Sequence, residues 1–161
     1  MTGRFAVLPL VAAGVATAFI ASPAAAQDAS VAERLDEQGM SYEIEGGNYK
    51  INLSLADRGR TQLVYVSGEA STYDGLKFRL IVAPAGSVED DKIDGAKALA
   101  LLSHSTTMKL GGWQLLSDGH LVLAIKALDT ASSAELGAMI KAAAYFADDR
   151  EIELSGDRDA Y

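Results

Sequence analysis

Apolar and polar residues alternate along most of the chain after residue 40, with the two-residue repeat of strands that bury one face. The alternation falls into four runs, which are interrupted by Gly46-Gly47, by a turn over 56–59 and by a polar loop over 68–75. Short turns of this kind join antiparallel neighbours. We therefore expect three or four antiparallel strands, carried by the runs 42–44, 49–55, 61–66 and 76–82, and we expect Pro84 to end the last of them.

Two further strands are predicted after a helical segment in the middle of the chain. Gly111-Gly112 returns the chain to an extended conformation at 113–116, and Asp118-Gly119 is a strong two-residue hairpin signal. The returning strand carries apolar residues at alternate positions, namely Leu121, Leu123 and Ile125. These six runs predict a sheet of five to six strands.

Three segments have the residues with which helices begin. Ser30 with Glu33, and Ser132 with Glu135, have the spacing of capping boxes, and Asp94 can cap a helix that extends through Leu102. The first helix is short and ends at Gly39, whereas the last has an apolar stripe spaced by threes and fours. That stripe consists of Leu136, Met139, Ile140, Ala143, Phe146 and Ala147.

The elements therefore follow the order α-β-β-β-(β)-α-β-β-α. Strands joined by short turns, with helices packed on the resulting sheet, define an α+β fold. We expect the last helix to cover the sheet, and we expect the carboxylate-rich tail from Asp148 to fray.

The first 26 residues have the organisation of a secretory signal peptide. Arg4 supplies a short positive start, an uncharged apolar stretch follows, and Pro23 precedes small residues that favour cleavage after Ala26. An uncleaved anchor is the alternative, because about 20 apolar residues can span a bilayer. The many alanines and the proline favour cleavage, which leaves residues 27–161 as one domain without a stable membrane anchor, in the periplasm or secreted by a bacterium.

Composition narrows the classes of partner. Removal of Arg4 with the leader lowers the formal net charge from −8 to −9, so nucleic acid is an unfavourable ligand and a cationic or neutral partner is favoured. The absence of cysteine from the sequence excludes disulfides, thiol nucleophiles and thiolate metal sites. Stability must come from packing alone.

No residue pattern predicts catalysis, a metal or a cofactor. His104 and His120 lie in different predicted elements, and the acidic run at 89–91 lacks the spacing of a calcium loop. Ser117, Asp118 and His120 have the residue types of a triad but crowd one hairpin turn, which is their simpler interpretation. We expect a protein that is not an enzyme and binds neither metal nor cofactor.

Two features favour binding to another protein. Ala134, Ala138 and Ala142 form a smooth stripe beside Tyr145 on the last helix, where another helix or subunit could approach closely. Plain helix propensity explains the same alanines. Trp113, the single tryptophan, is either an anchor for a partner or a core residue.

The chain resembles the YbjN-like family, whose fold is that of bacterial type III secretion chaperones. The residues that carry the resemblance are Leu35, Gly39 and Tyr42, then Tyr49, Ile51 and Leu53, then Gly59-Arg60, Gln62, Val64 and Val66, then Leu101-Leu102, Met108 and Gly112-Trp113, then Gly119, Leu121 and Leu123, then Asp129, Ser133 and Ala147-Asp148. Ser105 departs from the asparagine that such proteins often have. The predicted export also departs from the cytosolic action of secretion chaperones.

The resemblance implies a non-enzymatic protein-binding scaffold that can form a homodimer. Our leading hypothesis is an exported, chaperone-like module that binds a polypeptide by strand addition or by a helix-in-groove contact. Its candidate contact residues are Arg60, Trp113, Ala138, Ala142 and Tyr145. The alternative is a periplasmic small-molecule carrier with an apolar pocket between the sheet and the last helix, lined by Tyr42, Tyr65, Phe78 and Trp113.

Overall fold

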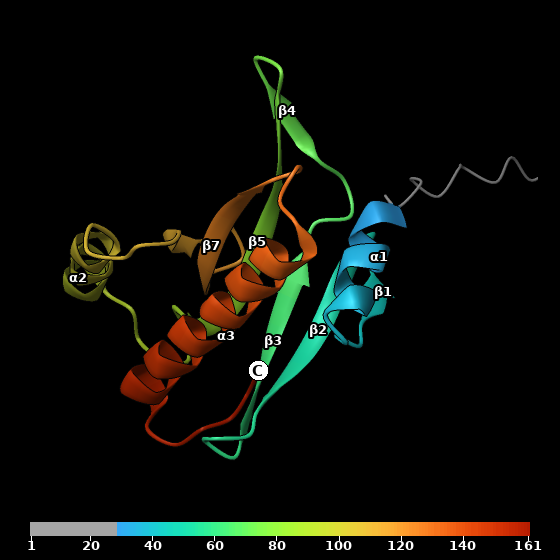
Figure 1. Ribbon diagram of the computed structural model, residues 1–161. Helices are drawn as coiled ribbons and strands as arrows, with labels where there is room; N and C mark the ends of the chain where they lie inside the picture. The colour runs from blue at the N-terminus through green and yellow to red at the C-terminus, as the bar shows by residue number, and fades with distance from the viewer. Residues whose placement is uncertain (1–28) are drawn as a thin grey trace, which may run out of the picture.

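The computed structural model describes residues 29–161, and the predicted signal peptide lies outside this range. The described chain is an α+β fold with three helices and one antiparallel sheet of seven strands (Figure 1). Its elements are α1 (Ala29–Glu37), β1 (Glu43–Glu45), β2 (Asn48–Leu55), β3 (Arg60–Val66), β4 (Ser71–Tyr73), β5 (Leu76–Ser87), α2 (Gly95–Ser105), β6 (Gly112–Leu115), β7 (His120–Leu128) and α3 (Ser133–Ser155).

The strand order is β1-β2-β3-β5-β7-β6, with β4 paired to β5 outside this path. The hairpin at Asp118-Gly119 is confirmed, because Leu116 donates its N–H to the carbonyl of His120 at 2.9 Å and β6 pairs with β7. Since β6 pairs only with β7 in this order, it forms one edge of the sheet.

The core lies between one face of the sheet and α3, which crosses that face (Figure 1). The predicted stripe of α3 supplies four of its buried side chains, Leu136, Ile140, Ala143 and Ala147. They meet the buried alternate residues of the long strands, which include Val64, Ile81 and Leu123. Within residues 29–161, no helix combines the length and the apolar character needed to cross a bilayer.

Two of the three predicted helix starts are confirmed. Asp94 accepts the N–H of Lys97 at 2.9 Å, and Ser132 with Glu135 forms a complete capping box. The third helix is present as α1, but Ser30 is not its cap, because it lies inside the helix, where its carbonyl and hydroxyl accept hydrogen bonds from Arg34. Gly39 has φ of 64° just after α1, as the predicted left-handed stop requires.

The prediction that Pro84 ends its strand is wrong, because β5 continues to Ser87. The carbonyl of Leu80 accepts the backbone N–H of Ser67, the residue that follows β3. Alternate residues of a strand point their backbone groups to the same side, so the backbone of Pro84, four residues later, also faces β3. The β3–β5 pairing there has already ended at Tyr65↔Val82. A missing N–H therefore costs no ladder bond, and the Pro84 carbonyl accepts Gln62 Nε2 at 2.7 Å.

The polar segment 68–75, predicted as a loop, contains the additional strand β4. It folds back on the start of β5, with Asp74 and Gly75 at the turn and both at positive φ. All three residues of β4 are exposed. An exposed strand leaves no alternation of buried and exposed residues in the sequence, which explains why it was not predicted.

The predicted fraying from Asp148 is also wrong, because α3 continues to Ser155. Asp148 and Glu151 are buried on its inner side, where arginines from the β2–β3 hairpin bind them. These ion pairs hold the end of the helix against the sheet.

Candidate protein-binding groove

A groove of about 150 Å³ separates α2 from the edge strand β6. We call it the α2–β6 groove, and its lining is apolar except for one glutamine: Ile93, Ala98, Leu101, Leu102, Trp113, Gln114, Leu115 and Leu121. Apolar cavities of about this volume accommodate a benzene-sized group. The groove is therefore large enough for one apolar side chain of a partner.

Exposed leucines contribute to both walls of this groove, Leu102 from α2 and Leu115 from β6. Leu99 and Leu102 of α2 are 68% and 59% exposed, and Leu115 of β6 is 56% exposed. Leu116, which follows Leu115, is also exposed. Single exposed apolar residues are common, but apolar side chains grouped along a groove are typical of interaction sites.

The position of α2 depends on a few polar contacts at its two ends. Lys97 donates from Nζ to the carbonyl of Asp91 at 2.8 Å near the start of the helix. At the other end Ser105 Oγ donates to the Leu101 carbonyl and accepts the backbone N–H of Trp113 at 2.9 Å. The second contact fixes α2 to the outer edge of β6.

Gly111 allows the chain to enter β6 close to β7. Its φ is 67°, and a Cβ added there would lie 2.3 Å from the carbonyl oxygen of Ala124. Any other residue would clash with the backbone of β7, so glycine is required for the edge strand to follow this path.

Trp113 is a core residue whose ring also forms a wall of the groove. It is 6% exposed, and its indole N–H donates to His104 Nδ1 at 3.0 Å. The guanidinium of Arg150 lies over its ring, 5.4 Å from the ring centre. On the side of Arg150 the indole borders a second cleft of about 450 Å³, which His104, Phe146, Asp149, Ile152 and Glu153 also line.

Exposed acidic residues lie close in sequence to two residues that line the groove, Ile93 and Leu121. Asp94 follows Ile93 directly and is exposed, and Asp118 is exposed in the turn before Leu121. The backbone N–H of His120 is the main cause that holds the pKa of the Asp118 carboxyl below its usual range, so this group is charged at neutral pH. Carboxylates beside an apolar groove favour a partner with basic residues next to its apolar ones.

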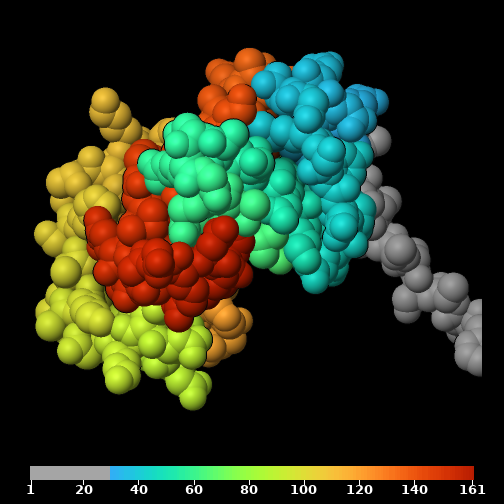
Figure 2. All heavy atoms as spheres, turned by 90° about the horizontal axis from the view of Figure 1, so that it is seen from below, coloured from blue at the N-terminus to red at the C-terminus, as the bar shows by residue number. Residues whose placement is uncertain are grey.

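Arg60, a predicted contact residue, lies in a cluster of ion pairs within the chain. Its guanidinium binds Asp148, binds Glu151 at 3.1 Å and donates to the carbonyls of Asp157 and Arg158. The C-terminal residues, red in Figure 2, accordingly lie against the β2–β3 hairpin. Its hydrogen bonds give Arg60 a structural role.

The three predicted contact residues of the last helix, Ala138, Ala142 and Tyr145, lie on the outer side of α3. The Tyr145 hydroxyl donates to Asp57 at 2.7 Å, and Arg58 lies over its ring at 4.8 Å. Ala138 is exposed and borders a cavity of about 580 Å³ that Leu110, Leu128 and Met139 also line, whereas Ala142 is half-buried. Nothing in the structure shows what would cover this alanine surface.

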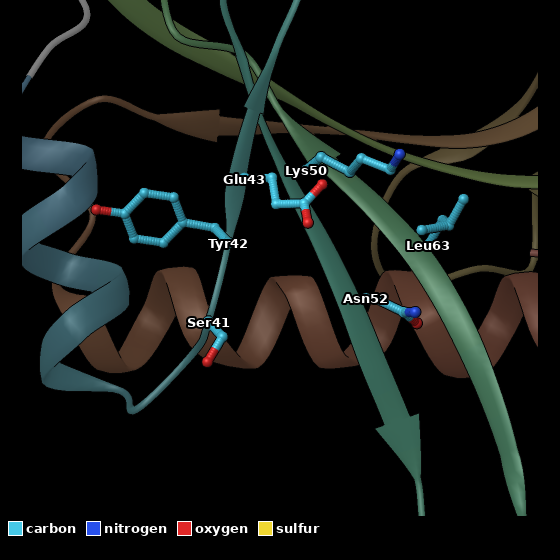
Figure 3. A pocket seen from close by; sticks show the side chains of 6 residues that line it. All are labelled: Ser41, Tyr42, Glu43, Lys50, Asn52 and Leu63. Atoms are coloured by element: carbon cyan, nitrogen blue, oxygen red, sulfur yellow. The ribbon is translucent and has the colours of Figure 1, made fainter.

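The four aromatic residues predicted to share one apolar pocket lie apart. Tyr65 and Phe78 alternate with buried residues and therefore lie on the sheet face away from α3, whereas Trp113 lies opposite buried Leu123 on the α3 face. Tyr42 packs edge-on against Tyr49. It also borders a cavity of about 510 Å³ with the polar residues Ser41, Glu43, Lys50 and Asn52, and in Figure 3 its ring points toward α1.

In the part of the chain that the structure describes, no three His, Cys, Asp or Glu side chains are grouped to hold a metal ion. Asp118 accepts the backbone N–H of His120 at 3.1 Å and lies 3.2 Å from the imidazole, so both residues belong to a local turn. Asp118 and His120 therefore lie at the hairpin turn that the sequence predicted.

The leucines beside the groove were not predicted as contact residues. A signal for them was present, because the segment 96–102 is apolar around the whole helix except at Lys97 and has no single apolar stripe. A helix of this kind on a protein surface has more apolar side chains than its own domain buries. Of the five predicted contact residues, the structure brings only Trp113 to the groove.

Searches against protein-family models, curated proteins and solved structures find no match for this chain. The resemblance to the YbjN-like family therefore stays a prediction from the sequence.

Proposed function

We propose that the mature chain is a non-enzymatic protein-binding module that holds a polypeptide partner in the α2–β6 groove. The observation that carries the proposal is the apolar lining of this groove together with the exposed leucines on both of its walls. An apolar side chain of the partner would enter the groove, and the flanking leucines would exclude water around it.

The charge of the chain supports a particular kind of partner segment. The formal net charge is −8 for the full sequence and −9 once Arg4 is removed, and the exposed Asp94 and Asp118 lie close in sequence to Ile93 and Leu121 of the groove. A segment that combines an apolar anchor with neighbouring lysines or arginines matches both properties. Acidic segments and nucleic acid would be repelled.

The proposal also includes a compartment and a family. The leader-like residues 1–26 support action outside the cytoplasm, in the periplasm or in the medium, and the order of helices and strands is compatible with a YbjN-like fold. Mass spectrometry of the protein from an exporting bacterial host should give a mature N-terminus near Gln27. A full-length product extracted from membranes would contradict export.

Two variants with matched exposure test the groove. Leu102 and Leu76 are 59% and 60% exposed, but only Leu102 lines the groove. A tagged mature protein is used to capture partners from periplasmic extract, and affinity is then measured with each purified partner. Leu102→Asp should weaken binding at least about tenfold, because anchors at interface centres contribute about 2 kcal/mol or more.

Leu76→Asp is the control and should leave the affinity unchanged. Equal binding by the two variants, or equal loss in both, would contradict the groove as the site. Repeated capture experiments that return no protein would contradict the binding function itself.

A further inference from the structure

We propose that His104 is a pH-sensitive clasp, which holds α2 against β6 and α3 when its imidazole is neutral and releases α2 when the imidazole is protonated. Because α2 forms one wall of the α2–β6 groove, the clasp would regulate partner binding. That regulatory role rests on the function proposed above, whereas the clasp itself rests on the geometry around one nitrogen atom.

Two donors converge on Nδ1 of His104. The indole N–H of Trp113 donates to it at 3.0 Å, and a guanidinium nitrogen of Arg150 lies 2.8 Å from it. Indole and guanidinium nitrogens only donate, so Nδ1 must be the acceptor and the neutral ring carries its hydrogen on Nε2. His104 thereby joins α2 to β6 and to α3 through one lone pair.

Protonation adds a hydrogen at the atom that accepts both bonds. Imidazolium has no acceptor, so the bonds from Trp113 and Arg150 are both lost. The new positive charge would also face the Arg150 guanidinium at hydrogen-bond distance. The arrangement seen in the structure is therefore specific to neutral His104.

The other charged groups around His104 do not replace these bonds. α3 brings Asp149, Arg150 and Glu153 to the cleft, and β6 brings the uncharged Trp113. A carboxylate near His104 would favour the protonated imidazole. Asp149, however, is already paired with Arg58 at 2.6 Å, and Glu153 is already paired with Arg150. Arg150 is thus the charged group that contacts the ring directly.

The helix that the clasp holds has few other attachments. Leu101 is the single buried side chain of α2, all of which lies within the described residues. The remaining polar contacts to other segments are those of Ser105 with Trp113 and of Lys97 with Asp91. Loss of the His104 contacts should therefore free the C-terminal end of α2.

The only tryptophan of the chain lies at the clasp, which allows a direct test on the mature protein without any partner. Tryptophan emission and hydrogen exchange of α2 amides are measured between pH 5 and pH 8, where histidine normally changes charge. Exchange rates are corrected for their intrinsic pH dependence. Acidification should change the emission and should accelerate exchange in α2 by roughly two- to tenfold, as expected when hydrogen bonds of a solvent-exposed side chain are lost.

Variants separate His104 from the other histidine. His104→Gln keeps an uncharged acceptor at every pH and should abolish both transitions. His104→Lys is charged throughout and should show rapid α2 exchange already at pH 8. His120→Gln, at the exposed first residue of β7, is the matched control and should behave like the wild type.

Persistence of both transitions in His104→Gln would overturn the clasp. A change in emission without faster α2 exchange would also overturn it, because His104 would then affect Trp113 without holding the helix. Neither result depends on partner binding, so failure of the clasp is distinguishable from failure of the Leu102→Asp test.

Discussion

Two buried carboxylates on the inner side of α3 determine how the C-terminal part of the chain is held. Asp148 binds both Arg58 and Arg60, while Glu151 accepts the N–H of Ala160 at 2.8 Å and a guanidinium N–H of Arg60 at 3.1 Å. Removing one partner of a buried pair leaves an uncompensated charge, which typically costs about 3–5 kcal/mol. Replacing either arginine or either carboxylate of this cluster should therefore destabilise the fold.

Glu151 makes the stability of the fold depend on pH with an unusual sign. Burial is the main cause that raises the pKa of its carboxyl above the usual range, against the lowering effects of Ala160 and Arg60. The folded chain therefore holds this proton at pH values where the unfolded chain has lost it. The stabilisation that this proton provides is present below the ordinary glutamate pKa of about 4.3 and is lost as the pH rises through the raised value.

Glu151→Gln should remove this dependence, because glutamine has no ionisation and keeps an oxygen acceptor. We expect the free energy of unfolding of the variant to rise relative to that of the wild type as the pH increases from about 4 to 7. Urea unfolding across this range measures the difference. Glu153→Gln, on the same helix but exposed, should show no comparable gain. A constant difference between Glu151→Gln and wild type at all pH values would contradict the argument.

At the level of elements, short-range sequence signals predicted helix starts and turns more reliably than they predicted strand ends. The caps at Asp94 and Ser132 and the Asp118-Gly119 hairpin act within four residues, and the structure confirms all three. The prediction at Ser30 failed because the same residue types also occur inside helices. Pro84 failed for a different reason, since the direction in which its missing N–H points depends on a neighbouring strand that the local sequence does not specify.

The residues of the α2–β6 groove were also hard to predict, because local sequence does not specify which segments meet in the folded chain. Trp113 was predicted as a candidate because it is the single tryptophan, whereas Leu102 was predicted only as the end of a helix. Which side of α2 stays exposed depends on where β6 and α3 lie, and those positions follow from tertiary packing. Arg60 was predicted to contact a partner but forms ion pairs and hydrogen bonds within the chain. The sequence did not indicate this, because its partners in α3 and the C-terminal tail lie about 90 or more residues away.

At the level of the whole molecule, the last five residues join three separate parts of the chain. Arg60 at the start of β3 donates to the carbonyls of Asp157 and Arg158, and Ala160 donates to Glu151 of α3. Arg158 binds Asp91, in the segment between β5 and α2, at 2.6 Å. A tail predicted to fray thus connects the start of β3 and the segment that follows β5 with the helix that covers the sheet.

Deletion of residues 157–161 should therefore destabilise the entire fold. Buried Asp91 and Glu151 would each lose a hydrogen-bond partner, although water gains access and offsets part of the loss. We expect the free energy of unfolding to fall by about 2–4 kcal/mol, within the range for losing hydrogen bonds to buried charges. Arg158→Gln should reproduce part of this loss, because Asp91 stays covered but loses its cation.

Asp157→Asn is the control for the tail, because Asp157 contributes its backbone carbonyl to Arg60 and this carbonyl is unchanged in the variant. Its free energy of unfolding should match that of the wild type. Thermal or urea unfolding monitored by far-UV circular dichroism distinguishes the outcomes. If the deletion were as stable as the wild type, the tail contacts would contribute nothing, and packing between α3 and the sheet alone would hold the C-terminal turns of the helix.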